Sequence, residues 1–297
     1  AALATVCDAH GVPLLVDNAH GAYLNFLVGG SRHPIALGAA MCCDSGHKTL
    51  PVLTGGAYLH LGPKAPVQEE TAVRNALALF GSTSPSYLIL QSLDRCNRYL
   101  SEGYPLRLYS CCGQLTRMRR VLNEQAAAAG CPLPLAVDDP AREPLKLTLD
   151  AAALGLTGTA LAEALRQDHI ECEYADPRYV VLMFTPENPP QDGERLAAAM
   201  REILNGISTS APLPELFVKA FSELETQTQC RCTIRQAVFA PQETLPAEQA
   251  VGRVCAMPTV SCPPAIPIVV SGEVVTPAAV ELMKRYHVEE VSVLCRN

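Results

Sequence analysis

Residues 12–21 read VPLLVDNAHG. Its first half, residues 12–16, is a continuous apolar run of strand length, which predicts a strand covered on both faces. Its second half places Asp17 and His20 directly after that strand. In a parallel α/β sheet, the carboxyl end of a strand is where the chemistry usually lies. We therefore expect Asp17 and His20 at a functional edge of an α/β sheet.

A second polar strand end follows the first. Residues 41–43 predict a brief apolar strand, and residues 44–48, DSGHK, come directly after it. Residues 55–61 predict a third strand. Because chemistry in such sheets gathers where strands end, we expect the polar residues of both strand ends to form one site.

The two strand ends together supply the residue types that pyridoxal phosphate requires. An enzyme with this cofactor needs a lysine to hold its aldehyde, an acid beside the pyridine nitrogen, and hydroxyl or imidazole donors for the phosphate. Lys48 and Asp17 are the lysine and the acid, while Ser45 and His47 are the donors. Taken singly, each also fits a simpler role, such as a turn cap or a solvated loop charge. Their order and spacing favour a cofactor site.

The rest of the chain divides into three predicted domains, residues 1–130, 131–210 and 211–297. Helical spacing in the first predicts helices over 69–80, 87–100 and 107–129, with Ser82–Pro85 as a cap that puts proline at the first helical position. The second domain has an α+β pattern, with strands predicted at 145–149, 170–174 and 179–184 and helices at 158–167 and 192–204. Prolines cut the third domain into short pieces before a helix at 277–286 and a strand at 291–294.

Composition excludes several classes of protein. The chain has 297 residues, is 48% hydrophobic and carries a net charge of −7, which fits a globular protein rather than a disordered one. A net acidic chain without a lysine or arginine block gives no electrostatic reason to bind nucleic acid or anionic lipid. No apolar run approaches the roughly 18 residues of a membrane span. We expect a cytoplasmic protein that binds a small-molecule substrate and neither nucleic acid nor a membrane.

The cysteines predict neither a disulfide framework nor a metal site. The chain has 13 of them, an odd number, and two pairs are adjacent in sequence, which indicates a reducing environment. The nearest approach to a metal spacing is Cys230-x-Cys232, and no second pair lies near it. We therefore expect no metal.

Several longer segments carry a resemblance to a known family. They are Val16–Ala22, Ser45–Pro51, Ser82–Leu88, Asp176–Tyr179 and, near the end of the chain, Gly252-Arg253, Pro263-Pro264 and Gly272-Glu273. Together they resemble the Orn/Lys/Arg decarboxylase family, a fold-type-I group that uses pyridoxal 5'-phosphate. The resemblance covers essentially the whole chain. It implies an α/β fold consisting of the remainder of a large cofactor-binding domain, an α+β small domain and a C-terminal cap domain, without the N-terminal part of the large domain.

The resemblance also implies a role for each site residue. Lys48 would be the catalytic lysine that holds the cofactor as a Schiff base, and Asp17 would pair with the pyridine nitrogen. Ser45 and His47 would contact the phosphate or the bound substrate, and His47 is a second candidate for the catalytic proton donor. His20 would lie beside the substituents of the cofactor ring.

The activity implied by the resemblance is decarboxylation of a basic amino acid, arginine, lysine or ornithine. Ser82 and Thr83 would reach a phosphate across the interface of a homodimer or larger homo-oligomer. Two alternatives stay open. The same lysine and aspartate serve aminotransferases and lyases, and a non-catalytic relative or fragment would keep the fold without the activity.

Overall fold

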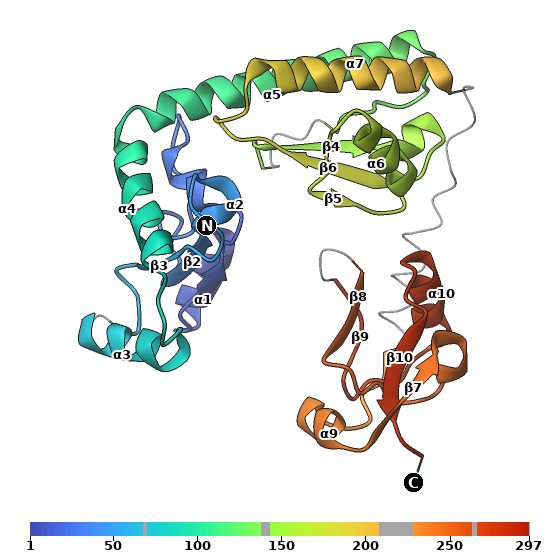
Figure 1. The fold of residues 1–297 in the computed structure, drawn as a ribbon. Coiled ribbons are helices and arrows are strands. Elements are labelled where there is room, and N and C mark those ends of the chain that lie inside the picture. The colour runs from blue at the N-terminus through green and yellow to red at the C-terminus, as the bar shows by residue number, and fades with distance from the viewer. Residues whose placement is uncertain (68–69, 138–142, 208–227, 263–265, 297) are drawn as a thin grey trace. The chain divides into compact units, whose positions relative to one another are not determined.

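The computed structural model describes residues 1–67, 70–137, 143–207, 228–262 and 266–296 (Figure 1). The chain divides into two compact units, of which the first comprises 1–116 and 184–189 and the second comprises 117–183 and 190–297. The predicted boundary at 210/211 lies outside the described residues, as do Pro263 and Pro264. The three-domain division stays a prediction.

The first unit is built on a three-stranded sheet in the order β1-β2-β3. Strands β1 (Leu15–Asp17) and β2 (Met41–Ser45) are parallel, and β3 (Ala57–Leu61) pairs with β2 in the antiparallel sense. The expectation that residues 12–16 form a strand covered on both faces was wrong. The strand begins only at Leu15, and that side chain is 61% exposed, because β1 is an edge strand among the described residues.

The first unit also contains helices. They are α1 (Ala2–Ala9), η1 (Ala22–Phe26), α2 (Gly46–Thr49), α3 (Glu70–Phe80), α4 (Tyr87–Ser101) and the start of α5 (Tyr104–Ala128). Ser92 Oγ on α4 accepts a hydrogen bond from Leu53 N, which ties the helix to the loop before β3. The cap predicted at Ser82–Pro85 was misplaced. The N-cap of α4 is Ser86, whose side chain accepts from Ile89 N, so the helix begins after the proline.

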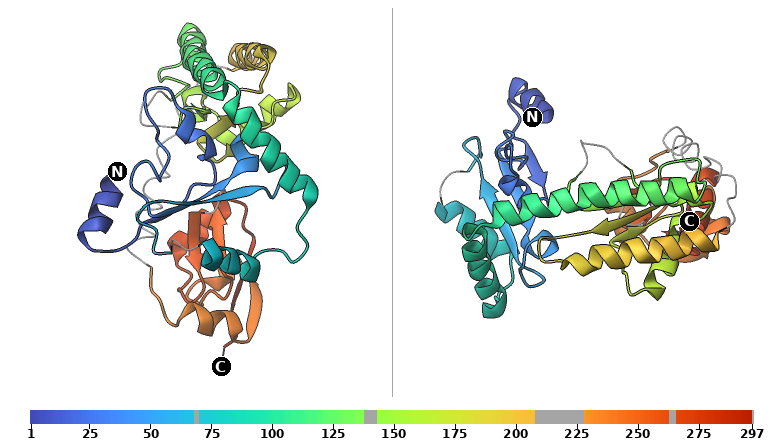
Figure 2. Two further views of the ribbon diagram at one scale, coloured as in Figure 1. Left: turned by 90° about the vertical axis from the view of Figure 1, so that its left-hand side faces the viewer. Right: turned by 90° about the horizontal axis from the view of Figure 1, so that it is seen from above.

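The second unit contains an antiparallel sheet in the order β4-β6-β5. Its strands are β4 (Lys146–Asp150), β5 (Tyr174–Ala175) and β6 (Tyr179–Met183), with helices α6 (Gly158–Gln167) and α7 (Pro190–Gly206). The long helices α5 and α7 lie side by side (Figure 2), and Gln125 Nε2 on α5 donates to Ala197 O on α7. The strand predicted at 170–174 is confined to its last residue and Ala175, because Ile170 N still bonds to Leu165 O at the end of α6.

The C-terminal part of the second unit is made of short elements, as the prolines predicted. They are α9 (Ile234–Phe239), β7 (Gln242–Pro246), η3 (Ala247–Ala250), β8 (Thr259–Cys262), β9 (Ile266–Val270), α10 (Pro277–Arg285) and β10 (Glu290–Leu294). β7 pairs with β10 and β8 with β9, both antiparallel. Leu282 and Met283 of α10 are fully buried in the core of this part together with Val291 and Val293 of β10.

Two features concern the expected environment of the chain. None of the helices in the described residues is both long and apolar enough to cross a membrane. Every cysteine whose side chain the structure describes is a free thiol.

Candidate functional site

The two polar strand ends meet in space. Because β1 and β2 are parallel, their carboxyl ends lie at the same edge of the sheet, with Asp17 level with Cys43. Asn18 N continues the pairing by donating to Cys43 O at 2.9 Å. Beyond the strands, Lys48 Nζ lies 3.3 Å from Nε2 of His20 and donates a hydrogen bond to it. The structure therefore joins the segment that bears Asp17 and His20 to the segment that bears Lys48.

The turn after β1 holds Asp17 and His20 in place. Asp17 Oδ1 accepts a hydrogen bond from Ala19 N at 3.1 Å, the local side-chain bond that aspartate often makes in turns. The carboxylate remains exposed. Gly21 closes the turn, and a Cβ there would lie 2.1 Å from the side-chain oxygen of Asn18. Glycine at position 21 thus lets the Asn18 side chain fold under the turn.

The turn after β2 positions Ser45 and Lys48. Ser45 is the N-cap of α2, but its side chain makes no capping hydrogen bond in the described structure. The hydroxyl therefore does not cap the helix. Gly46 is buried, and a Cβ there would lie 3.1 Å from the Tyr58 ring and 3.3 Å from the Val52 side chain. The absence of a side chain at position 46 allows α2 to pack closely on β3, and this packing fixes where Lys48 leaves the helix.

His47 is held in one tautomer when neutral. Its Nδ1 lies 3.2 Å from the carbonyl oxygen of Gly56, and because a carbonyl only accepts, Nδ1 must carry the proton. Nε2 of neutral His47 is therefore a proton acceptor. Donation from Nε2 requires the imidazolium form.

Ser82 and Thr83 are not brought to Lys48. Both lie in the exposed turn between α3 and α4, where Ser82 Oγ accepts from Ser84 N at 3.1 Å. Among the described residues, no hydrogen bond joins Lys48 to either residue, to Asp17 or to Ser45. The roles expected for these four residues around a bound cofactor stay predictions.

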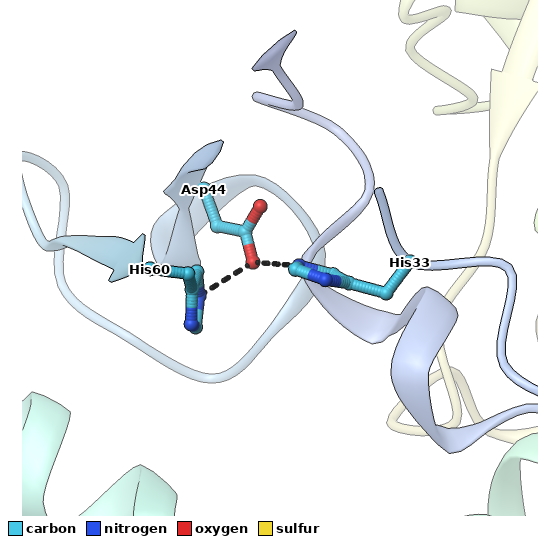
Figure 3. A group of neighbouring side chains, drawn as sticks. All are labelled: His33, Asp44 and His60. Atoms are coloured by element: carbon cyan, nitrogen blue, oxygen red, sulfur yellow. Dashed lines mark hydrogen bonds and ion pairs between the residues drawn. The ribbon is translucent and has the colours of Figure 1, made fainter. Parts of the chain in front are cut away.

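A neighbouring cluster that the sequence did not predict is formed by His33, Asp44 and His60 (Figure 3). Nε2 of His33 and Nε2 of His60 each lie 2.9 Å from the same carboxylate oxygen, Oδ2 of Asp44. Burial acts to raise the pKa of Asp44, but the two imidazoles and the Asn18 amide beside the carboxylate hold that pKa well below its usual range. The sequence carries no spacing signal for this cluster, because its members lie on a turn and on two different strands.

The donor set at the strand ends fits pyridoxal phosphate. It includes a primary amine, an exposed carboxylate, a hydroxyl outside the helix cap and two imidazoles. An amine can bond to an aldehyde, and a carboxylate can hold a proton on a pyridine nitrogen. Lys48, Asp17, Ser45, His47 and His20 are the residues that would hold the group.

Comparison with known proteins identifies the family of the chain. The family model for the Orn/Lys/Arg decarboxylase major domain matches residues 2–191. An arginine decarboxylase of Bacillus subtilis is 30% identical over 276 residues, which are 89% of this chain and 54% of that protein. An arginine decarboxylase of Bacillus anthracis is 25% identical over 94% of this chain and 56% of its own length.

Solved structures agree on the fold. The constitutive lysine decarboxylase of E. coli matches with a TM-score of 0.66 at 18% identity, over 96% of this chain and 55% of that chain. Lysine decarboxylase A of Pseudomonas aeruginosa matches with a TM-score of 0.68 at 16% identity, over 93% of this chain and 48% of that chain. The chain thus spans about half the length of the relatives it matches. With a family model covering most of its length, this chain belongs to the Orn/Lys/Arg decarboxylase family.

Proposed function

We propose that the protein carrying this chain decarboxylates a basic amino acid, arginine, lysine or ornithine, with pyridoxal 5'-phosphate bound through Lys48. The observation that carries the proposal is the 3.3 Å contact between Lys48 Nζ and His20 Nε2, which brings the lysine to the strand end that bears Asp17. Membership of the family supports the choice of reaction. The names of the arginine and lysine decarboxylases among its relatives support the substrate class.

Lys48 is the residue that attaches the cofactor. Its amine must lose a proton before the nitrogen can attack an aldehyde carbon. Nε2 of His20 accepts a hydrogen bond from Nζ, which orients the amine and offers the departing proton an acceptor. When bound, the cofactor supplies an electron sink for the pair that remains at Cα after carbon dioxide leaves.

The other residues bind and orient the group. The exposed carboxylate of Asp17 would hold a proton on the pyridine nitrogen. Ser45 and His47 would donate to the phosphate or to the substrate. Ser82 and Thr83 would add phosphate contacts from the other subunit of a homodimer or larger homo-oligomer.

The proton that returns to Cα has two candidate donors, Lys48 and His47. Neutral His47 donates its only ring proton to Gly56 O, so it can protonate Cα only from the imidazolium form. Lys48 Nζ would serve as the other donor, because a lysine amine carries donor protons of its own. The hydrogen bond of His47 to Gly56 thus favours Lys48 as the donor.

The test is chemical trapping followed by product analysis. The protein is mixed with pyridoxal 5'-phosphate, its visible absorbance is recorded, borohydride is added, and mass spectrometry locates the adduct. A reducible adduct on Lys48 supports the cofactor assignment, and release of carbon dioxide with the matching amine supports the reaction. A keto acid product would instead indicate an aminotransferase. An adduct elsewhere, or none, would contradict the assignment of Lys48 and favour a non-catalytic relative.

A further inference from the structure

We propose that His33, Asp44 and His60 bind a divalent transition-metal ion in a site separate from that of the cofactor. The inference goes beyond the proposed function and does not depend on it. Side chains alternate along a strand, so Asp44 faces the side of β2 opposite to Ser45. Asp17 is paired with Cys43 and shares the side of Ser45. The three residues therefore form a second cluster across the sheet from Asp17 and Ser45.

The spacing of the donor atoms suits one ion. The three ligand atoms lie within 4.8 Å of one another, and both imidazole nitrogens are 2.9 Å from Asp44 Oδ2. Metal bonds of about 2.0–2.2 Å in tetrahedral geometry place ligand atoms about 3.3 Å apart. The two distances from the imidazole nitrogens to Asp44 Oδ2 need to lengthen by only a few tenths of an ångström to accept an ion.

The residues behind Asp44 fix its orientation. Oδ1 accepts hydrogen bonds from Asn18 Nδ2 at 2.8 Å and from Cys42 Sγ at 3.3 Å, which leaves Oδ2 toward the two histidines. Metal-binding carboxylates are commonly held in this way by outer hydrogen bonds. Asp44 is 3% exposed, so these hydrogen bonds hold its carboxylate away from solvent.

The hydrogen-bonding of the cluster without an ion differs between the two histidines. His33 Nδ1 accepts from Ile35 N at 3.4 Å, so Nε2 carries the proton and donates to Asp44. Metal binding must displace that proton and the Ile35 contact, which is near the outer limit for a hydrogen bond. Nε2 of His60 is buried, yet its approach to Asp44 lacks hydrogen-bond geometry within the described residues. A metal ion between the two side chains would give the His60 nitrogen a well-directed bond in place of this poorly angled contact.

A cavity of about 520 Å³ leaves room for a further ligand on the ion. It is lined by all three cluster residues and by the polar side chains of Asn25 and Asn97. The His60 side chain is 39% exposed, although its Nε2 atom is buried and faces Asp44. Three protein ligands beside an open position is the arrangement of metal sites that bind water or substrate.

The ligand types select the class of ion. Two imidazoles and one carboxylate suit Zn²⁺, Fe²⁺ and their neighbours, whereas Mg²⁺ and Ca²⁺ favour all-oxygen sites. The probes are therefore Zn²⁺ and, as its spectroscopic substitute, Co²⁺. Visible bands of Co²⁺ report nitrogen and oxygen ligands, while thiolate ligands add intense charge transfer in the near ultraviolet.

The experiment uses the untagged full chain after treatment with a chelator. Zn²⁺ is titrated by calorimetry, with Mg²⁺ as a comparison, and Co²⁺ is followed by absorbance. We expect one high-affinity equivalent of Zn²⁺, no comparable binding of Mg²⁺ and a Co²⁺ spectrum without thiolate charge transfer. Both His60→Gln and Asp44→Asn should weaken Zn²⁺ binding at least about tenfold, since loss even of outer partners typically costs 10–100-fold.

Two matched controls separate this site from others. His10→Gln removes an exposed histidine outside the cluster, and Cys230→Ser with Cys232→Ser removes the cysteine pair whose sequence spacing comes nearest to that of a metal site. Both should leave Zn²⁺ affinity unchanged. Unchanged affinity in His60→Gln, or binding lost in the cysteine variant, would overturn the proposal. Because the His60 side chain is partly exposed, the His60→Gln variant should fold even if Asp44→Asn does not. Circular dichroism of each variant checks its folding.

Discussion

Lys48 Nζ and His20 Nε2 lie 3.3 Å apart although 28 residues separate them in sequence. The parallel pairing of β1 with β2 is responsible, because it brings both strand ends to one edge of the sheet. The contact gives the lysine amine a defined direction and a nearby proton acceptor. Lys48 and Asp17 both lie at this edge, and each can be tested by substitution.

Replacing Lys48 by alanine should abolish the borohydride-stable adduct of pyridoxal phosphate, because the only amine at the strand ends would be lost. Mass spectrometry of the reduced protein measures the adduct directly. Lys64→Ala is the matched control, since Lys64 is an exposed lysine that pairs with Asp8. An adduct that persists in Lys48→Ala, or vanishes in Lys64→Ala, would refute the role of Lys48.

Asp17→Asn should leave the adduct on Lys48 but lower the turnover number about a hundredfold or more. The amide cannot hold the extra proton on the pyridine nitrogen, and loss of one such electrostatic contact typically costs about 10²–10³ in rate. The measurement is carbon dioxide release at saturating substrate. Asp168→Asn, in the other unit, should keep normal turnover, and equal losses in both variants would point to a general effect of the substitution.

Gly158→Ala should destabilise the second unit by about 1–3 kcal/mol or more, the cost of overpacking a fitted interior. A Cβ at this position would lie 2.3 Å from Asp176 O and 2.4 Å from Tyr179 O. Both are backbone atoms, which cannot move away as easily as the end of a flexible side chain. Chemical denaturation measures the change. In the control Gly206→Ala, the new Cβ lies in open space. Its free energy of unfolding should stay within about 0.5 kcal/mol of that of the parent or rise slightly.

The thiol of Cys111 should resist alkylation until strongly alkaline pH. Burial, with a smaller contribution from neighbouring Cys112, raises the pKa of Cys111 to about 11. The thiol therefore stays protonated in the folded state at pH values above about 8.5, its pKa in the unfolded chain. The stabilisation that follows from this raised pKa is complete below about pH 8.5 and is lost as the pH rises toward 11. Iodoacetamide labelling read by mass spectrometry checks this, with exposed Cys230 expected to react first. Equal labelling rates at pH 8 would contradict it.

The sequence predicted those features that depend on local pattern. Helix α6 was expected at residues 158–167 and spans Gly158–Gln167, because its apolar spacing and its following strand agree with its packing. The strand ends were predicted for the same reason. The start of α4 was misplaced because several residues before it are good caps, and only the backbone shows that Ser86 makes the capping bond.

The cluster of His33, Asp44 and His60 shows what sequence alone leaves out. All three residues are visible in the sequence, but their proximity is not. His60 lies near Asp44 only because β3 pairs with β2 in the antiparallel sense, with Tyr58 opposite Asp44. That register depends on the turn between the strands and on close packing at Gly46. Neither can be read from residue spacing.

The alternation of β2 has one more consequence. Asp44 and Ser45 are consecutive, so a single peptide unit links the histidine-lined cavity to the edge where Lys48 stands. The backbone amide of Ser45 is therefore a natural reporter for both faces of the sheet. Isotope labelling at this one amide would let nuclear magnetic resonance detect a ligand arriving from either side, and separate titrations with Zn²⁺ and with pyridoxal phosphate would distinguish the two.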